Sequence, residues 1–141
     1  MKKRILLLTA LGLAASFQVF AAGLPISKAP EDAKLYIISP QDGDVVGPNV
    51  TVKFGLKNMG VAPAGVDRDN TGHHHLIING ELPKPGIPMG ADVKHFGGGK
   101  TQTTLTLEPG IHTLQLILGN HIHIPHEPMV TSDKITITVK K

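Results

Sequence analysis

The chain has 141 residues, a formal net charge of +3, eight histidines and no cysteine. This length suits one domain with a single hydrophobic core, and the lack of cysteine excludes thiol nucleophiles, thiolate metal sites and disulfides. Lys2, Lys3 and Arg4 account for the whole excess of basic over acidic residues. The remainder is balanced in charge, so no basic surface points to nucleic acid.

The first 21 residues are organised like a secretory signal peptide. A basic start is followed by an apolar run over residues 5–19, and Val19-Phe20-Ala21 places small residues where a signal peptidase cleaves. We expect a mature chain from Ala22 onwards, in the periplasm or secreted, with no membrane anchor after cleavage. An uncleaved anchor is the alternative, but the apolar run is short for a membrane span. Residues 22–32 are then a flexible lead-in to a domain over residues 33–141.

Short β-type segments separated by turn residues follow in chain order. The predicted strands are residues 34–38, 50–56, 74–78, 101–107, 111–118 and 135–139. Alternation is clearest in the fifth strand, where Leu114, Leu116 and Leu118 share the inward face. Residues 81–99 contain three prolines and five glycines, which predicts a loop with at most one short edge strand. No helical period is sustained, so we predict an all-β fold, an immunoglobulin-like antiparallel β-sandwich of six or seven strands.

The histidines gather at positions that this fold would bring together. Residues 73–75 begin the third strand, residues 121–126 follow the fifth, and His95 precedes the fourth. Alternate residues of an extended strand point to one face, so each His-x-His pair can present two imidazoles on one side. In an immunoglobulin-like sandwich, these segments share one end. The predicted metal ligands are His73, His75, His95, His121, His123 and His126.

Two histidines are set apart from this group by their positions. His74 points away from its neighbours, which favours a role in the core or the loop. His112 begins the fifth strand and is expected at the opposite end, where it is more simply a hydrogen-bonded residue at the strand end. We expect its replacement by alanine to leave metal affinity unchanged.

Imidazole is the commonest protein ligand for transition metals, and the general affinity order places Cu(II) above Zn(II) in an all-imidazole site. The expected cofactor is therefore copper, with zinc as the alternative. Met59, Met89 and Met129 also lie in loops; thioethers favour Cu(I), although methionine more commonly fills gaps in packing. Because ligating imidazoles must be neutral, binding should weaken below pH about 6.5.

Other chemistry finds little support in the sequence. Residues 67–72 resemble a calcium loop but lack its distal acidic ligand, so Asx turns, or carboxylates that orient the histidines, are the better interpretation. There is no Gly-x-Ser-x-Gly nucleophile elbow and no glycine loop that leads from a strand into a helix. Because the sequence contains no recognised catalytic motif, we do not expect an enzyme.

Several unusual runs carry a family resemblance. They are residues 61–66, 70–76, 95–99, 109–116 and 120–126. These runs resemble a small bacterial family catalogued as domain of unknown function 4399, over about residues 34–139. The resemblance implies a small exported domain. It implies no activity, so the function rests on the residues.

Three functions remain open from the sequence. The first is a periplasmic protein that binds copper or zinc through its histidine-rich end. The second is a non-metal interaction module that uses the same loops to bind a protein partner or the cell envelope. The third is a small metalloenzyme with an open coordination position.

Overall fold

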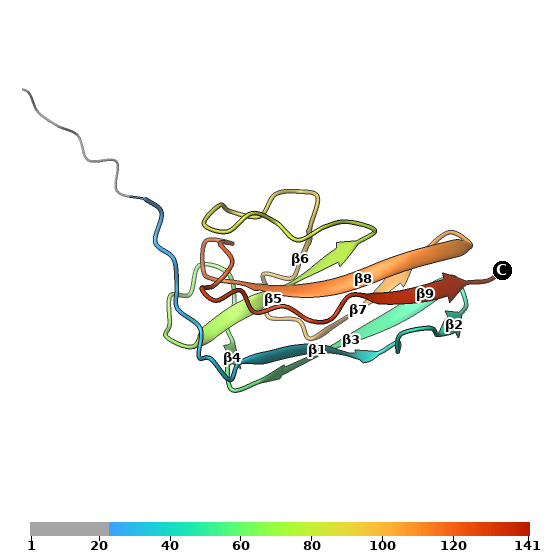
Figure 1. Ribbon diagram of the computed structural model, residues 1–141, viewed down its shortest axis with the longest axis horizontal. Helices are drawn as coiled ribbons and strands as arrows, with labels where there is room; N and C mark the ends of the chain where they lie inside the picture. The colour runs from blue at the N-terminus through green and yellow to red at the C-terminus, as the bar shows by residue number, and fades with distance from the viewer. Residues whose placement is uncertain (1–22) are drawn as a thin grey trace, which may run out of the picture.

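The computed structural model describes residues 23–141, which contain nine β-strands and no helix (Figure 1). The longer strands are β1 (Lys34–Ser39), β3 (Asn49–Lys57), β5 (Thr71–Ile78), β7 (Gln102–Thr106), β8 (Gly110–Gly119) and β9 (Ile135–Val139). Three two-residue strands complete the set: β2 (Val45–Val46), β4 (Gly60–Val61) and β6 (Lys94–His95). The six longer strands correspond to the six predicted from sequence. The predicted signal peptide, residues 1–21, lies outside the described residues.

The strands form two layers. The smaller sheet has the order β1-β3-β7, and the larger sheet has the order β2-β9-β8-β5-β4, with β6 paired to β5. All pairs between the longer strands are antiparallel, whereas β2–β9 and β4–β5 are parallel. The predicted all-β sandwich is therefore confirmed. Within residues 23–141, no helix has the length and apolar character that a membrane crossing requires.

The main core lies between the two sheets. The alternating residues Leu114, Leu116 and Leu118 of β8 are fully buried there, against Val52 and Phe54 of β3. Burial of each such side chain contributes about 1.5–3 kcal/mol. The inward face predicted for this strand is thus confirmed.

A second apolar layer covers the outer face of the larger sheet. Ile77 of β5 and Ile117 of β8 are buried with Val93, and Met89 and Met129 pack on them. Residues 79–99 and 120–131, here called the cover, supply this layer. Figure 1 shows residues 79–99 above β5 and β8, on the side away from β1 and β3. Consequently β5 is buried on both faces over residues 72–77.

One of the predicted strands differs in its bounds. β5 begins at Thr71, three residues earlier than expected, because Gly60 and Val61 of β4 pair with Thr71 and Gly72. Residues 81–99 are a loop with one short edge strand, β6, as expected, and residues 81–93 form no strand. Three prolines in this stretch lack the amide that a sheet ladder needs.

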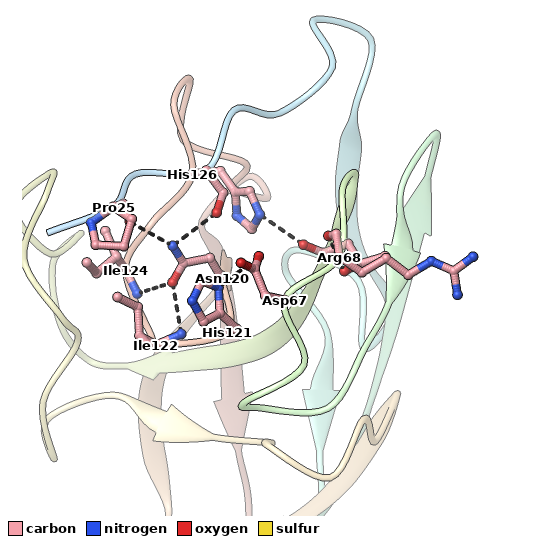
Figure 2. A network of polar contacts seen from close by, with 10 residues as sticks. Pro25, Asp67, Arg68, Asn120, His121, Ile122, Ile124 and His126 are labelled. Carbon is pink, nitrogen blue, oxygen red and sulfur yellow. Dashed lines mark hydrogen bonds and ion pairs between the residues drawn. The ribbon is translucent and has the colours of Figure 1, made fainter.

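The predicted lead-in contacts the domain within its described part. Ala29 is buried, and its amide donates to the carbonyl of Glu127 at 3.0 Å. The side-chain amide of Asn120 donates to the Pro25 carbonyl at 3.2 Å, as Figure 2 shows. The segment before β1 therefore holds the second half of the cover at the end of β8.

Candidate metal centre

Strand β5 positions two imidazoles on one face. His74 points into the main core, where its ring lies 5.1 Å from that of Phe54. His73 and His75 therefore point the other way, with ring centroids 4.6 Å apart. The shared face expected for this pair is confirmed. It is the outer face of the larger sheet, beneath the cover, rather than the open end of the sandwich.

The third imidazole comes from β6. Pairing of β6 with β5 places His95 directly opposite His75. Nε2 of His95 lies 3.1 Å from Nε2 of His73. The two-residue strand β6 thus brings His95, which lies 20 positions after His75 in the chain, next to His73 and His75.

The fourth imidazole comes from a tight turn after β8. The amide of His123 donates to the Asn120 carbonyl at 2.9 Å. The Asn120 side-chain oxygen accepts from the amides of Ile122 and Ile124 (Figure 2). His123 has a φ of 66°, a left-handed conformation that is uncommon outside glycine. Its Nδ1 lies 3.0 Å from Nε2 of His73.

These four side chains form one compact group. A nitrogen atom from each of His73, His75, His95 and His123 lies within 4.8 Å of the others. In a tetrahedral site with metal–nitrogen bonds of about 2.0 Å, ligand nitrogens are about 3.3 Å apart. The two shortest contacts, 3.0 and 3.1 Å, are already near this separation. The group can therefore hold a metal ion after small side-chain movements.

The surroundings keep the deeper imidazoles neutral. Burial, together with repulsion from the nearby His123 and His95, lowers the pKa of His73 to about 4. Burial also lowers the pKa of His75 to about 3, with repulsion from His73 as the next cause. The pKa of His123 is lowered as well, first by burial and then by His95. A neutral imidazole has a free nitrogen lone pair, which is the form that binds metals.

Several nitrogens at the group have no hydrogen-bond partner. They are Nδ1 of His73 and both ring nitrogens of His75, all of them buried. Unsatisfied buried polar atoms are rare in folded proteins and cost about 1–3 kcal/mol each. At His75, one of these nitrogens would be satisfied by a metal ion, so the donor set fits such an ion better than it fits an ordinary polar cluster.

Two predicted ligands lie outside this group. His121 has its Nδ1 3.2 Å from a carboxylate oxygen of Asp67. His126 is buried, and its Nε2 donates to the Thr71 carbonyl at 3.0 Å. An extended backbone through His121 and His123 would place both rings on one face, but the turn at Asn120 separates them. Figure 2 shows His121 beside Asp67 and His126 turned toward the opposite side of Asn120.

The remaining histidines have the structural roles expected from their positions. His112 donates from Nε2 to the Glu108 carbonyl at 2.8 Å, and its Nδ1 accepts from the Asn79 side chain at 2.9 Å. His74 is buried in the core, and neither ring nitrogen has a well-placed partner. Burial lowers the pKa of His74 to about 4, and the backbone of Lys100 offsets only part of this effect.

Glycines make room for two of the four rings, which the sequence analysis missed. A Cβ atom at Gly119 would lie 2.7 Å from Cε1 of His75, and one at Gly97 would lie 2.6 Å from Nε2 of His95. Both distances are below ordinary contact, so these positions need glycine when the rings are in place. The signal in the sequence was a glycine two residues after His95 and one immediately before Asn120.

The Gly97 position gives a direct test of His95. We expect Gly97→Ala to lower metal affinity at least about tenfold, because the new methyl group displaces the exposed His95 ring and one ligand is worth more than about 1.4 kcal/mol. Gly98→Ala is the matched control, since a Cβ there meets nothing within 4 Å. Competition titration of both variants with Zn(II) measures the difference. Equal affinities would show that His95 is not a ligand.

Histidine 74 gives a test of the core. We expect His74→Leu to raise the free energy of unfolding by about 1 kcal/mol at pH 7, because a side chain of similar volume removes two unsatisfied buried nitrogens. His112→Leu should instead lower it by about 1 kcal/mol, since two hydrogen bonds are lost. Urea unfolding of the metal-free proteins measures both. Destabilisation by His74→Leu as large as that by His112→Leu would contradict this account of the core.

Comparison with known proteins places the chain without assigning an activity. The family model for a domain of unknown function (DUF4399) matches residues 52–140, from β3 to the end of β9. No curated protein and no solved structure matches the chain. The matched region contains all four histidines of the candidate centre. The chain therefore belongs to the family described as domain of unknown function (DUF4399).

Proposed function

We propose that this protein binds one transition-metal ion, copper first and zinc second, through His73, His75, His95 and His123. The observation that carries the proposal is the convergence of four imidazoles from three separate segments onto one point. Burial of His73 and His75 supports it, because both imidazoles are held neutral and His75 has no hydrogen-bond partner at either ring nitrogen.

Copper is favoured over zinc by chemistry rather than by geometry. Among divalent ions, imidazole sites bind Cu(II) more tightly than Zn(II).

The number of ligands distinguishes metal binding from catalysis. Four imidazoles fill a tetrahedral shell, whereas zinc enzymes usually keep one position for water or substrate. The four-histidine set therefore favours metal binding or handling over a metalloenzyme.

The proposed location is the periplasm or the cell exterior, after removal of residues 1–21. The basic start, the apolar run and the small residues at Val19 and Ala21 support this proposal. Expression of the full chain followed by mass spectrometry of the periplasmic fraction tests it. A mature protein that begins at Ala22 is expected, and retention of Lys2 in a membrane fraction would contradict it.

We also infer an immunoglobulin-like topology for the sandwich. It is supported by the division of the longer strands into β1-β3-β7 and β9-β8-β5, which parallels the A-B-E and G-F-C strands of immunoglobulin domains.

The test of function is metal content and affinity. Full-length chain expressed without a tag should retain or bind about one equivalent of Cu(II) or Zn(II), with a Kd below about 1 μM. A variant with all four ligands replaced by glutamine is the control and should bind no stoichiometric metal. Equal binding by both proteins, or none by either, would overturn the proposal and leave the interaction module as the better interpretation.

A further inference from the structure

Met89, in the cover, lies against one of the four histidines. A Cβ atom at Gly119 would lie 2.7 Å from Cε of Met89 and also 2.7 Å from Cε1 of His75. These two carbons are therefore no more than 5.4 Å apart, twice the 2.7 Å distance. The end of the Met89 side chain thus occupies the space beside the His75 ring that the missing side chain of Gly119 leaves open.

The backbone fixes Met89 relative to a second ligand. The Met89 amide donates to the carbonyl of His123 at 2.9 Å. Its side chain is partly buried on the cluster of Ile77, Val93 and Ile117. One loop residue is therefore anchored to His123 through its backbone and to the surroundings of His75 through its side chain.

The chemistry of this side chain differs from that of the four imidazoles. The sulfur of methionine is bonded directly to Cε, and its flexible side chain can present either atom toward a neighbour. Thioether sulfur is a soft donor that favours Cu(I), whereas imidazole is a suitable ligand for both Cu(II) and Zn(II). A thioether beside a histidine site therefore shifts the preference of the site toward Cu(I).

We propose that Met89 is a sulfur ligand of Cu(I) at the centre, together with the buried imidazoles, and that it strengthens the binding of this oxidation state. This inference rests on the proposed metal-binding function and extends it to the oxidation state of the ion. Met89 supplies the sulfur, and the buried His73 and His75 supply nitrogens from the outer face of the larger sheet. Met129 packs on the same apolar cluster and provides the comparison.

The experiment compares Met89→Leu with Met129→Leu in the full-length chain. Leucine keeps the apolar volume, and exchange of methionine for leucine is well tolerated in packed sites. Cu(I) affinity is measured by competition with bicinchoninate under anaerobic reducing conditions, and Zn(II) affinity is measured in parallel. We expect Met89→Leu to weaken Cu(I) binding at least about tenfold and to leave Zn(II) binding within about twofold, while Met129→Leu changes neither.

X-ray absorption of the Cu(I) protein gives a second readout. A sulfur scatterer is expected in the wild type and in Met129→Leu, and only nitrogen scatterers in Met89→Leu. Unchanged Cu(I) affinity in Met89→Leu, or no sulfur in the wild type, would overturn the role of Met89 while leaving a histidine site that still binds Zn(II). Failure of the wild type to bind either ion would overturn the proposed function itself.

Discussion

Replacement of His123 by alanine is expected to lower metal affinity about 100-fold, because one of four ligands is lost from a site where each is worth more than about 1.4 kcal/mol. His123 is partly exposed and lies in a turn, so the fold should survive the change. The Asn120 side chain accepts the amides of Ile122 and Ile124, and neither bond uses the His123 imidazole. Competition titration with Zn(II) and Cu(II) measures the loss.

The control for this variant lies two residues earlier. His121→Ala should change metal affinity by no more than about threefold, since the His121 ring pairs with Asp67 instead of joining the group. His112→Ala should likewise leave affinity unchanged. If His121→Ala weakened binding as much as His123→Ala, the turn at Asn120 would have to be rearranged in the metal-bound protein, and the four-histidine set would be wrong.

The metal-free protein is expected to lose stability steeply as the pH falls from 7 to 5. His73, His74 and His75 are each at most 1% exposed, and their folded-state pKa values lie near 4, 4 and 3, below the ordinary 6.5. At a pH between the folded-state pKa of such a group and 6.5, the unfolded chain binds a proton that the folded chain does not, so acid favours unfolding. Each such group contributes a slope of up to about 1.4 kcal/mol per pH unit. We expect the free energy of unfolding to fall by at least about 3 kcal/mol over this range.

Urea unfolding at pH 7, 6 and 5 measures this loss. His74→Leu removes one of the three groups without touching the metal centre, so its profile should be flatter by about 1 kcal/mol per pH unit. A flat profile in the wild type would mean that these imidazoles are solvated in the folded state. That result would also remove the argument that the site is held neutral.

The same pKa values change the pH range expected for metal binding. From the unperturbed value, the sequence predicted weakening below pH about 6.5. Because His73 and His75 remain neutral to about pH 4 and 3 in the folded chain, protons compete with the metal at these two ligands only at lower pH. The decline with acid should therefore reflect the more exposed ligands and the loss of the fold.

Much of the fold was predictable because it follows from local alternation. The leucines of β8 and the His-x-His of β5 both use the two-residue period of a strand, and their faces came out as expected. The pairing of His73 with Gly119 also brings the predicted loops to one end of the sandwich.

The rest of the site depends on non-local structure. The second His-x-His looked the same in sequence, but Asn120 builds a turn and His123 takes a positive φ, so His121 and His123 diverge. The cover was also missed, although the unbroken apolar run from Leu116 to Leu118 is typical of a strand buried on both faces. Proline-rich and glycine-rich loops have no period from which their packing could be predicted.

Placement of ligands on both the sheet and the cover has a mechanical consequence. His73 and His75 belong to a central strand of the larger sheet, whereas His95 and His123 lie in the two segments of the cover. An ion bound by all four would cross-link these segments to the sheet, as a disulfide would in a chain that had cysteines. Unlike a disulfide, the ion would be lost when the chain unfolds, so it would stabilise only the folded, closed cover, and by an amount that rises with the concentration of free metal. Metal supply would then set how readily the cover opens and how quickly a protease cuts it.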